Sequence, residues 1–117
     1  SFKKKLIKKY KQCIISNDDE DLCEAAHIIP YSESDLTNKY DVNNGLLLSS
    51  ALHKMFDDYL FTIDKNGRII LSNTIMNKKS YKNYHKYNKL QLNLNTETLT
   101  NLKTHYDKFI ELNTMIN

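Results

Sequence analysis

Four polar residues occupy positions from which they could act together on a substrate. His27 closes one short apolar stretch and Asn44 opens another. His53 lies four residues before Asp57, and on a helix that spacing brings both side chains to the same face. An imidazole exchanges protons near neutral pH, and imidazole and carboxylate groups are common ligands of divalent metals. The four residues are therefore candidates for metal-assisted acid–base chemistry.

Each of these residues also has a purely structural interpretation. His27 can be a hydrogen-bonded core histidine, and Asn44 can belong to a plain Asn-Gly turn. His53 can be a surface residue of a helix, and Asp57 can bind backbone amides at the end of that helix. The residue types alone leave both interpretations open.

The apolar stretches around these residues predict two strands followed by a helix. Residues 22–29 read LCEAAHII and predict a short buried strand that Pro30 ends. Residues 46–48 predict a second strand, and the letters SSALHKMF predict a helix capped by one of the two serines. Residues 31–44 are polar and turn-rich, and loops of that length are usually functional or disordered. A His, an Asn and a His on strand, loop and helix can converge at one end of such a unit.

Further elements are expected on both sides of this unit. Residues 2–12 carry apolar side chains at helical spacing and predict a short basic amphipathic helix. The Asn-Gly pair between residues 60–64 and 68–72 predicts a β-hairpin.

The last part of the chain predicts a loop and a helix. Residues 73–94 predict a loop with a basic helical turn, and an amphipathic helix capped by Asn95 or Thr96 follows. A length of 117 residues suits one compact domain. The sequence therefore predicts a single domain over residues 1–117 of the mixed α+β class.

Lysines are concentrated in two segments that flank an acidic middle. Residues 1–11 carry six Lys and residues 78–89 carry five, both without an acid. Residues 12–64 carry eleven acids against two Lys, a balance of −9. Lys residues interleaved with Tyr and His, as in the second segment, suit nucleic acid, although a solvated Lys-rich surface has the same composition.

Composition argues against several other classes of protein. No apolar run approaches the roughly 20 residues of a membrane span, and no apolar stretch follows the basic start as in a signal peptide. Two Cys residues cannot build a disulfide framework or a four-thiolate zinc site. We therefore expect an intracellular protein without a membrane partner, in the cytoplasm, nucleoid or nucleus. The first residue is Ser rather than Met, so fused domains outside residues 1–117 stay open.

The motifs of the central segment resemble those of one family. CEAAHIIPYSES, followed by DVNNGLLLSSALHKMFDDYLFTID, is similar to the His-Asn-His (HNH) endonucleases. It is most similar to the branch that reads AAHI-x-P, then NGL-x-L, then H-x-x-FD. Each motif alone occurs widely, but the ordered set at workable spacing is specific. The resemblance implies a ββα-metal fold with its metal-binding core at about residues 22–58.

The same resemblance implies roles for individual residues. His27 matches the general base that activates water for attack on a phosphodiester, and Asn44 matches the residue that holds the loop and orients this base. His53 matches a ligand of the single divalent metal, which stabilises charge on the phosphate and on the leaving oxygen. Contacts with nucleic acid are expected from Lys54, Lys78, Lys79, Lys82 and Lys86.

Ala26 departs from the family pattern. Many members place Asp or His at this position as a second metal ligand, and Ala cannot bind a metal. Asp57, one helical turn from His53, is the favoured replacement, and Glu24, on the same strand face as Ala26, is the other. Carboxylate and water ligands favour Mg or Mn, whereas imidazole widens the choice to Zn, Ni or Co.

We therefore expect a metal-dependent endonuclease that cleaves double-stranded DNA, with His27 activating water and His53 holding the metal. The alternative is an HNH-fold nucleic-acid-binding module that has lost catalysis because of Ala26. A structural domain with incidental histidines is a third interpretation. Recognition sequence and oligomeric state are not encoded in any recognisable pattern.

Overall fold

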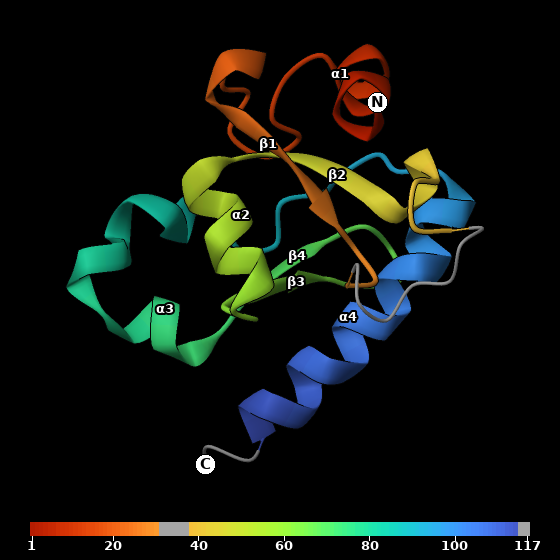
Figure 1. The fold of residues 1–117 in the computed structure, drawn as a ribbon. Coiled ribbons are helices and arrows are strands. Elements are labelled where there is room, and N and C mark those ends of the chain that lie inside the picture. Colours follow the sequence, from red (N-terminus) through yellow and green to blue (C-terminus); the bar gives the residue numbers. More distant parts are fainter. Residues whose placement is uncertain (31–37, 115–117) are drawn as a thin grey trace. The chain divides into compact units, whose positions relative to one another are not determined.

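The computed structural model describes residues 1–30 and 38–114 (Figure 1). Residues 31–37 of the expected long loop lie outside the described residues. The chain forms two compact units, Ser1–Lys54 and Met55–Asn117, and each is described by itself. Its helices and short antiparallel hairpins form the mixed α+β structure that the sequence predicts. That one HNH domain spans residues 1–117 stays a prediction.

The first unit is built on an antiparallel hairpin of β1 (Cys23–His27) and β2 (Gly45–Ser49). Cys23 pairs with Ser49 at one end, and His27 pairs with Gly45 at the other. Every residue of β2 is buried, which explains why this strand reads as an apolar run without alternation. Helix α2 (Ser50–Asp57) begins directly after β2 and completes a strand–strand–helix sequence (Figure 1).

Helix α1 (Phe2–Tyr10) packs on this hairpin. It ends two residues before the predicted limit, where Lys11 takes a φ of 70°. Its apolar face approaches Gly45 so closely that a Cβ there would lie 2.5 Å from Cζ of Phe2 and 2.9 Å from Cδ1 of Leu6. Two short 3-10 turns, η1 (Glu20–Leu22) and η3 (Val42–Asn44), lead into the strands.

The apolar core of the first unit comes from α1, the loop after it, both strands, the residue that follows β1 and the start of α2. Both cysteines belong to this core as free thiols, in agreement with the absence of a disulfide framework in the sequence. The buried apolar side chains of this unit are Leu6, Cys13, Ile15, Cys23, Ala26, Ile28, Leu46, Leu47, Leu48 and Leu52.

The second unit contains the predicted hairpin, β3 (Phe61–Ile63) and β4 (Ile69–Leu71). Gly67 in its turn has a φ of +83°, a conformation that glycine adopts without steric cost. Between this hairpin and the last helix the chain forms α3 (Asn73–Asn77) and η4 (Lys79–Tyr87). The segment at 73–94 is therefore more helical than the loop with one helical turn that the sequence predicts.

Helix α4 (Thr96–Thr114) closes the second unit. The side chain of Asn95 caps it by accepting a hydrogen bond from the Thr98 N–H at 2.8 Å, as one of the two predicted caps. Among the described residues, no helix combines the length and apolar character needed to cross a membrane.

His105 of α4 is a buried histidine with both ring nitrogens engaged. Its Nε2–H donates to the Phe56 carbonyl at 2.8 Å, and the Thr62 hydroxyl donates to Nδ1 at 2.7 Å. The ring also stacks on Phe56, at 3.7 Å between centroids, and on Tyr59. Burial disfavours the charged form and lowers the pKa of His105 from 6.5 to about 4.

The buried neutral ring of His105 makes stability depend on pH. Because its folded-state pKa lies below its ordinary value of 6.5, the unfolded chain binds the proton first as the pH falls. The stability that the neutral His105 ring contributes is therefore fully present above pH 6.5. As the pH falls from 6.5 to about 4, this stability is lost at about 1.4 kcal/mol per pH unit.

We predict that His105→Gln is less stable than the wild type at pH 7 but loses less stability on acidification. Urea unfolding at pH 7, 6 and 5 measures both slopes. Equal slopes for the two proteins would mean that His105 is not the group responsible.

Candidate active site

His27 lies at the end of β1, half-buried, with its ring held from two directions. Its Nε2 is 2.8 Å from the carbonyl oxygen of Lys39. A carbonyl can only accept, so Nε2 carries the proton and Nδ1 is the nitrogen whose lone pair can take one. The ring of Phe2 stacks on the imidazole, with centroids 4.5 Å apart and planes inclined by 20°.

Asn44 is completely buried and bonds both backbone groups of Ile29. Its Oδ1 accepts the Ile29 N–H at 2.8 Å, and its Nδ2 donates to the Ile29 carbonyl at 3.3 Å. The backbone carbonyl of Asn44 also accepts the N–H of Ile28 at 3.0 Å. This residue therefore fastens the segment that follows His27 to the start of β2.

His53 of α2 faces Glu24 of β1. Its Nδ1 is 2.7 Å from Oε1 of Glu24, and both side chains stay partly exposed, at 23% and 50%. Hydrogen bonds from His53, and to a lesser extent from Ser50, hold the pKa of the Glu24 carboxyl below its ordinary value. Lys3 of α1 adds a smaller electrostatic contribution in the same direction. An imidazole nitrogen and an ionised carboxylate oxygen are thus brought together by helix and strand.

Ala26 and Asp57 are the two other positions considered for the predicted metal site. Ala26 is buried and pairs with Leu46 in the sheet. Asp57 is the last residue of α2 and is exposed to solvent. Within residues 1–30 and 38–114, no three His, Cys, Asp or Glu side chains gather into a group that could hold a metal. Glu24 and His53 are one pair of such ligand types that the described chain brings together.

The lysines expected at nucleic acid are all exposed. Lys54 follows His53 on α2, and the others lie on the segment that joins α3 and η4 and along η4 itself. This segment is anchored inside the second unit, where Nε2 of His85 donates to the Ile75 carbonyl at 2.6 Å. The five exposed side chains are Lys54, Lys78, Lys79, Lys82 and Lys86.

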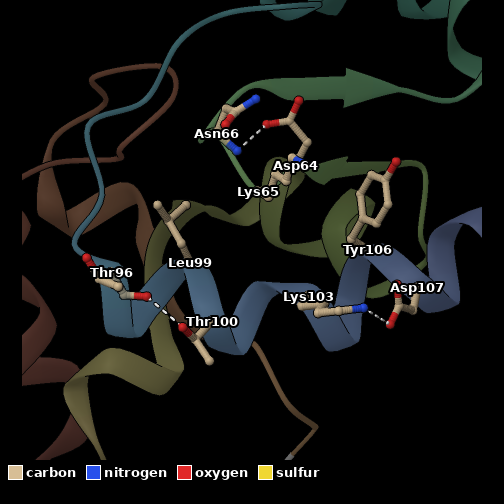
Figure 2. Close-up of a pocket in the computed structure, with 9 residues that line it drawn as sticks. All are labelled: Asp64, Lys65, Asn66, Thr96, Leu99, Thr100, Lys103, Tyr106 and Asp107. Atoms are coloured by element: carbon tan, nitrogen blue, oxygen red, sulfur yellow. Dashed lines mark hydrogen bonds and ion pairs between the residues drawn. The ribbon is translucent and has the colours of Figure 1, made fainter.

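Figure 2 shows a pocket in the second unit that contains none of the candidate residues. It has a volume of about 620 Å³ and lies between the turn of the β3–β4 hairpin and α4. Several of its polar groups already have partners: Lys103 pairs with Asp107 at 2.9 Å, and Asp64 accepts the Asn66 N–H at 2.8 Å. The candidate residues of the first unit, Glu24, His27, Asn44 and His53, therefore lie outside this pocket.

His27 at the end of the first strand, Asn44 directly before the second strand and His53 on the helix define a unit of the ββα type found in HNH nucleases. The family model described as HNH endonuclease matches residues 13–64, which include all three strand and helix elements of this unit. The match confirms the family predicted from the motifs. The narrower branch stays a prediction. No curated protein matched the sequence.

The sequence-based prediction expects a neighbouring carbonyl to fix the tautomer of His27 but identifies neither Lys39 nor Phe2 as a partner of this ring. Phe2 is recognisable only as an apolar position of a helix, and the Lys39 contact is made by a backbone carbonyl, which leaves no signal in the residue type. Both contacts join segments that are far apart in the chain.

The bonds of Asn44 allow a test of its structural role. We predict that Asn44→Ala lowers the free energy of unfolding by about 2–4 kcal/mol, because the N–H and carbonyl of Ile29 both lose this partner in a part-buried place. Chemical denaturation measures the loss. Neighbouring Asn43, whose Oδ1 accepts from the partly exposed Lys9 ammonium, is the matched control, and Asn43→Ala should cost about 1 kcal/mol or less. Equal losses in the two variants would contradict this structural role of Asn44.

Proposed function

We propose that this protein is a metal-dependent endonuclease that hydrolyses phosphodiester bonds in double-stranded DNA. HNH proteins are generally nucleases, and residues 13–64 carry that family's sequence. The observation that carries the proposal is the state of His27: its Nε2 donates to a backbone carbonyl, which leaves the lone pair on Nδ1. A ring in this tautomer can accept a proton from water at neutral pH.

In this proposal, His27 is the general base. It would take a proton from the water that attacks the phosphorus atom. Asn44 supports this role indirectly, because its bonds to Ile29 hold the backbone that follows the base. The base is thereby kept at the end of β1 rather than on a freely moving loop.

Glu24 and His53 are the residues that we propose hold the divalent ion. Their facing atoms are 2.7 Å apart, close to the roughly 3 Å that separates adjacent ligands of an octahedral ion with bond lengths of about 2.1 Å. Mg²⁺ usually keeps several waters and binds one or two carboxylates together with substrate phosphate, so a small set of protein ligands suits it. When bound, the ion would stabilise negative charge on the phosphate and leaving oxygen. Mg²⁺ or Mn²⁺ fits this donor set, and the imidazole also permits Zn²⁺, Ni²⁺ or Co²⁺.

Exposed lysines supply the proposed contacts with DNA. Lys54 follows the metal-binding histidine on α2, and Lys3, Lys4, Lys5 and Lys8 are exposed along α1 of the same unit. Lys78, Lys79, Lys82 and Lys86 provide a second exposed basic segment. Such contacts to phosphate do not depend on sequence and weaken as salt is added.

A nucleic-acid-binding module without catalysis is the second candidate function. Ala26 at the position of a usual metal ligand favours it, together with the lack of a three-ligand group among the described residues. It predicts salt-sensitive DNA binding that His27→Ala leaves unchanged.

Plasmid cleavage separates these two functions. We predict that the wild type nicks supercoiled plasmid at neutral pH with Mg²⁺ or Mn²⁺ and not with EDTA. His27→Ala should cut at least about 100-fold more slowly, because it removes the general base. Lys103→Ala, on the pocket of the second unit, is the control and should cut normally. If wild type and His27→Ala bind DNA equally and neither cuts with Mg²⁺, Mn²⁺ or Ni²⁺, the protein is a binding module.

The metal ligands can be distinguished without measuring activity. We predict that Glu24→Gln lowers the affinity for Mn²⁺ at least about tenfold, because the neutral amide is a poor metal ligand although it can still accept the hydrogen bond of His53. Calorimetric titration and the Mn²⁺-induced rise in melting temperature report this affinity. Asp57→Asn should bind Mn²⁺ like the wild type. The opposite pattern would transfer the ligand role from Glu24 to Asp57.

A further inference from the structure

Helix α1 contacts His27, the candidate general base, through the aromatic ring of Phe2. Phe2 and Leu6 are four residues apart, and both contact the place where a Cβ at Gly45 would lie. Gly45 has an ordinary extended backbone with a φ of −144°, so the backbone conformation does not require a glycine here. The glycine instead provides space, because it has no side chain. Because Gly45 is paired with His27 across the hairpin, this space brings the Phe2 ring to the end of β1.

The contact between the two rings restrains the imidazole in a way that the hydrogen bond cannot. The bond from Nε2 to the Lys39 carbonyl holds one edge of the ring but does not by itself oppose rotation of the ring plane about that edge. The Phe2 ring lies against the face of the imidazole at 4.5 Å and 20°, which opposes this rotation. Tyr40 meets Phe2 edge-on at 6.5 Å and 67°, so the Phe2 ring itself is packed from another direction.

We propose that Phe2 is a positioning residue for the general base: its ring holds the His27 imidazole so that Nδ1 keeps one direction toward the reacting water. This inference rests on the proposed endonuclease function. Phe2 precedes the segment 13–64 that matches the family, so α1 contributes this restraint from outside the matched core. The same helix carries exposed lysines of the first unit, which places part of the proposed DNA-contacting surface and the restraint on the base in one element.

Two substitutions at Phe2 separate stacking from simple packing. Phe2→Leu keeps an apolar side chain in the same place but removes the flat ring, whereas Phe2→Tyr keeps the ring. In single-turnover cleavage with saturating Mn²⁺, we expect Phe2→Leu to cut about 10–100-fold more slowly, since small misplacements of catalytic groups have effects of this size. DNA affinity, measured in EDTA, should stay within about twofold of wild type because no phosphate contact is removed. Phe2→Tyr should restore cleavage, and wild-type rates in Phe2→Leu would overturn the proposal.

An NMR measurement tests the restraint independently of catalysis. The Hε1 proton of His27, assigned by its disappearance in His27→Ala, should show an upfield ring-current shift in wild type and Phe2→Tyr but not in Phe2→Leu. If the wild type does not cut DNA with any metal, the endonuclease proposal fails, and this shift alone decides whether Phe2 holds the ring. An equal shift in wild type and Phe2→Leu would overturn the positioning role.

Gly45→Ala provides a second variant that retains the Phe2 ring. Its added Cβ would lie 2.5 Å from Cζ of Phe2, so the ring must move away. We expect slower cleavage and a smaller Hε1 shift, in the same direction as Phe2→Leu. If Phe2→Leu does not fold, Gly45→Ala tests the positioning role of Phe2 in its place. An unchanged cleavage rate and an unchanged Hε1 shift in Gly45→Ala would count against the proposal.

Discussion

The pairing of the Asn44 amide with the backbone of Ile29 is the constraint on which the first unit depends. The two residues are fifteen positions apart and lie at the two ends of the long loop between β1 and β2. A buried backbone N–H and carbonyl need partners, and one side-chain amide provides both an acceptor and a donor. His27 lies two residues before Ile29. Lys39, whose carbonyl bonds the His27 ring, lies between Ile29 and Asn44 in the sequence. The same pair of hydrogen bonds therefore joins the two ends of the loop and is linked to the position and the tautomer of His27.

The bond between Glu24 and His53 provides a second link, between helix and hairpin. Ion pairs that are as exposed as this one stabilise a fold only slightly, so stability is a poor explanation for it. Its chemical consequence is larger, because it keeps an ionised carboxylate next to an imidazole nitrogen at a place that solvent reaches. The residue that supplies this carboxylate lies two positions before Ala26 on the same strand, where it can compensate for a side chain that binds no metal.

Environment separates the histidines into different roles although the residue type is the same. His105 is buried, both of its nitrogens are bonded and its pKa is lowered to about 4, so it stays neutral and supports the core of the second unit. His27 and His53 are half-buried, and a ring nitrogen of each lies 2.7–2.8 Å from an oxygen acceptor. Histidines of this second kind keep access to water, which proton transfer and metal binding both require.

The sequence by itself determined most elements of this protein and the family that residues 13–64 match. Apolar runs, the Asn-Gly turn and the cap at Asn95 predicted both hairpins and the last helix to within a few residues, because these features depend on neighbours along the chain. The ordered His, Asn and His motifs identified the family that matches residues 13–64. The tertiary structure decided which distant groups meet: Glu24 faces His53, Phe2 stacks on His27, and Asn44 bonds Ile29. Periodicity shows which face of an element is apolar, but only the packing of the folded chain determines which residue lies opposite it.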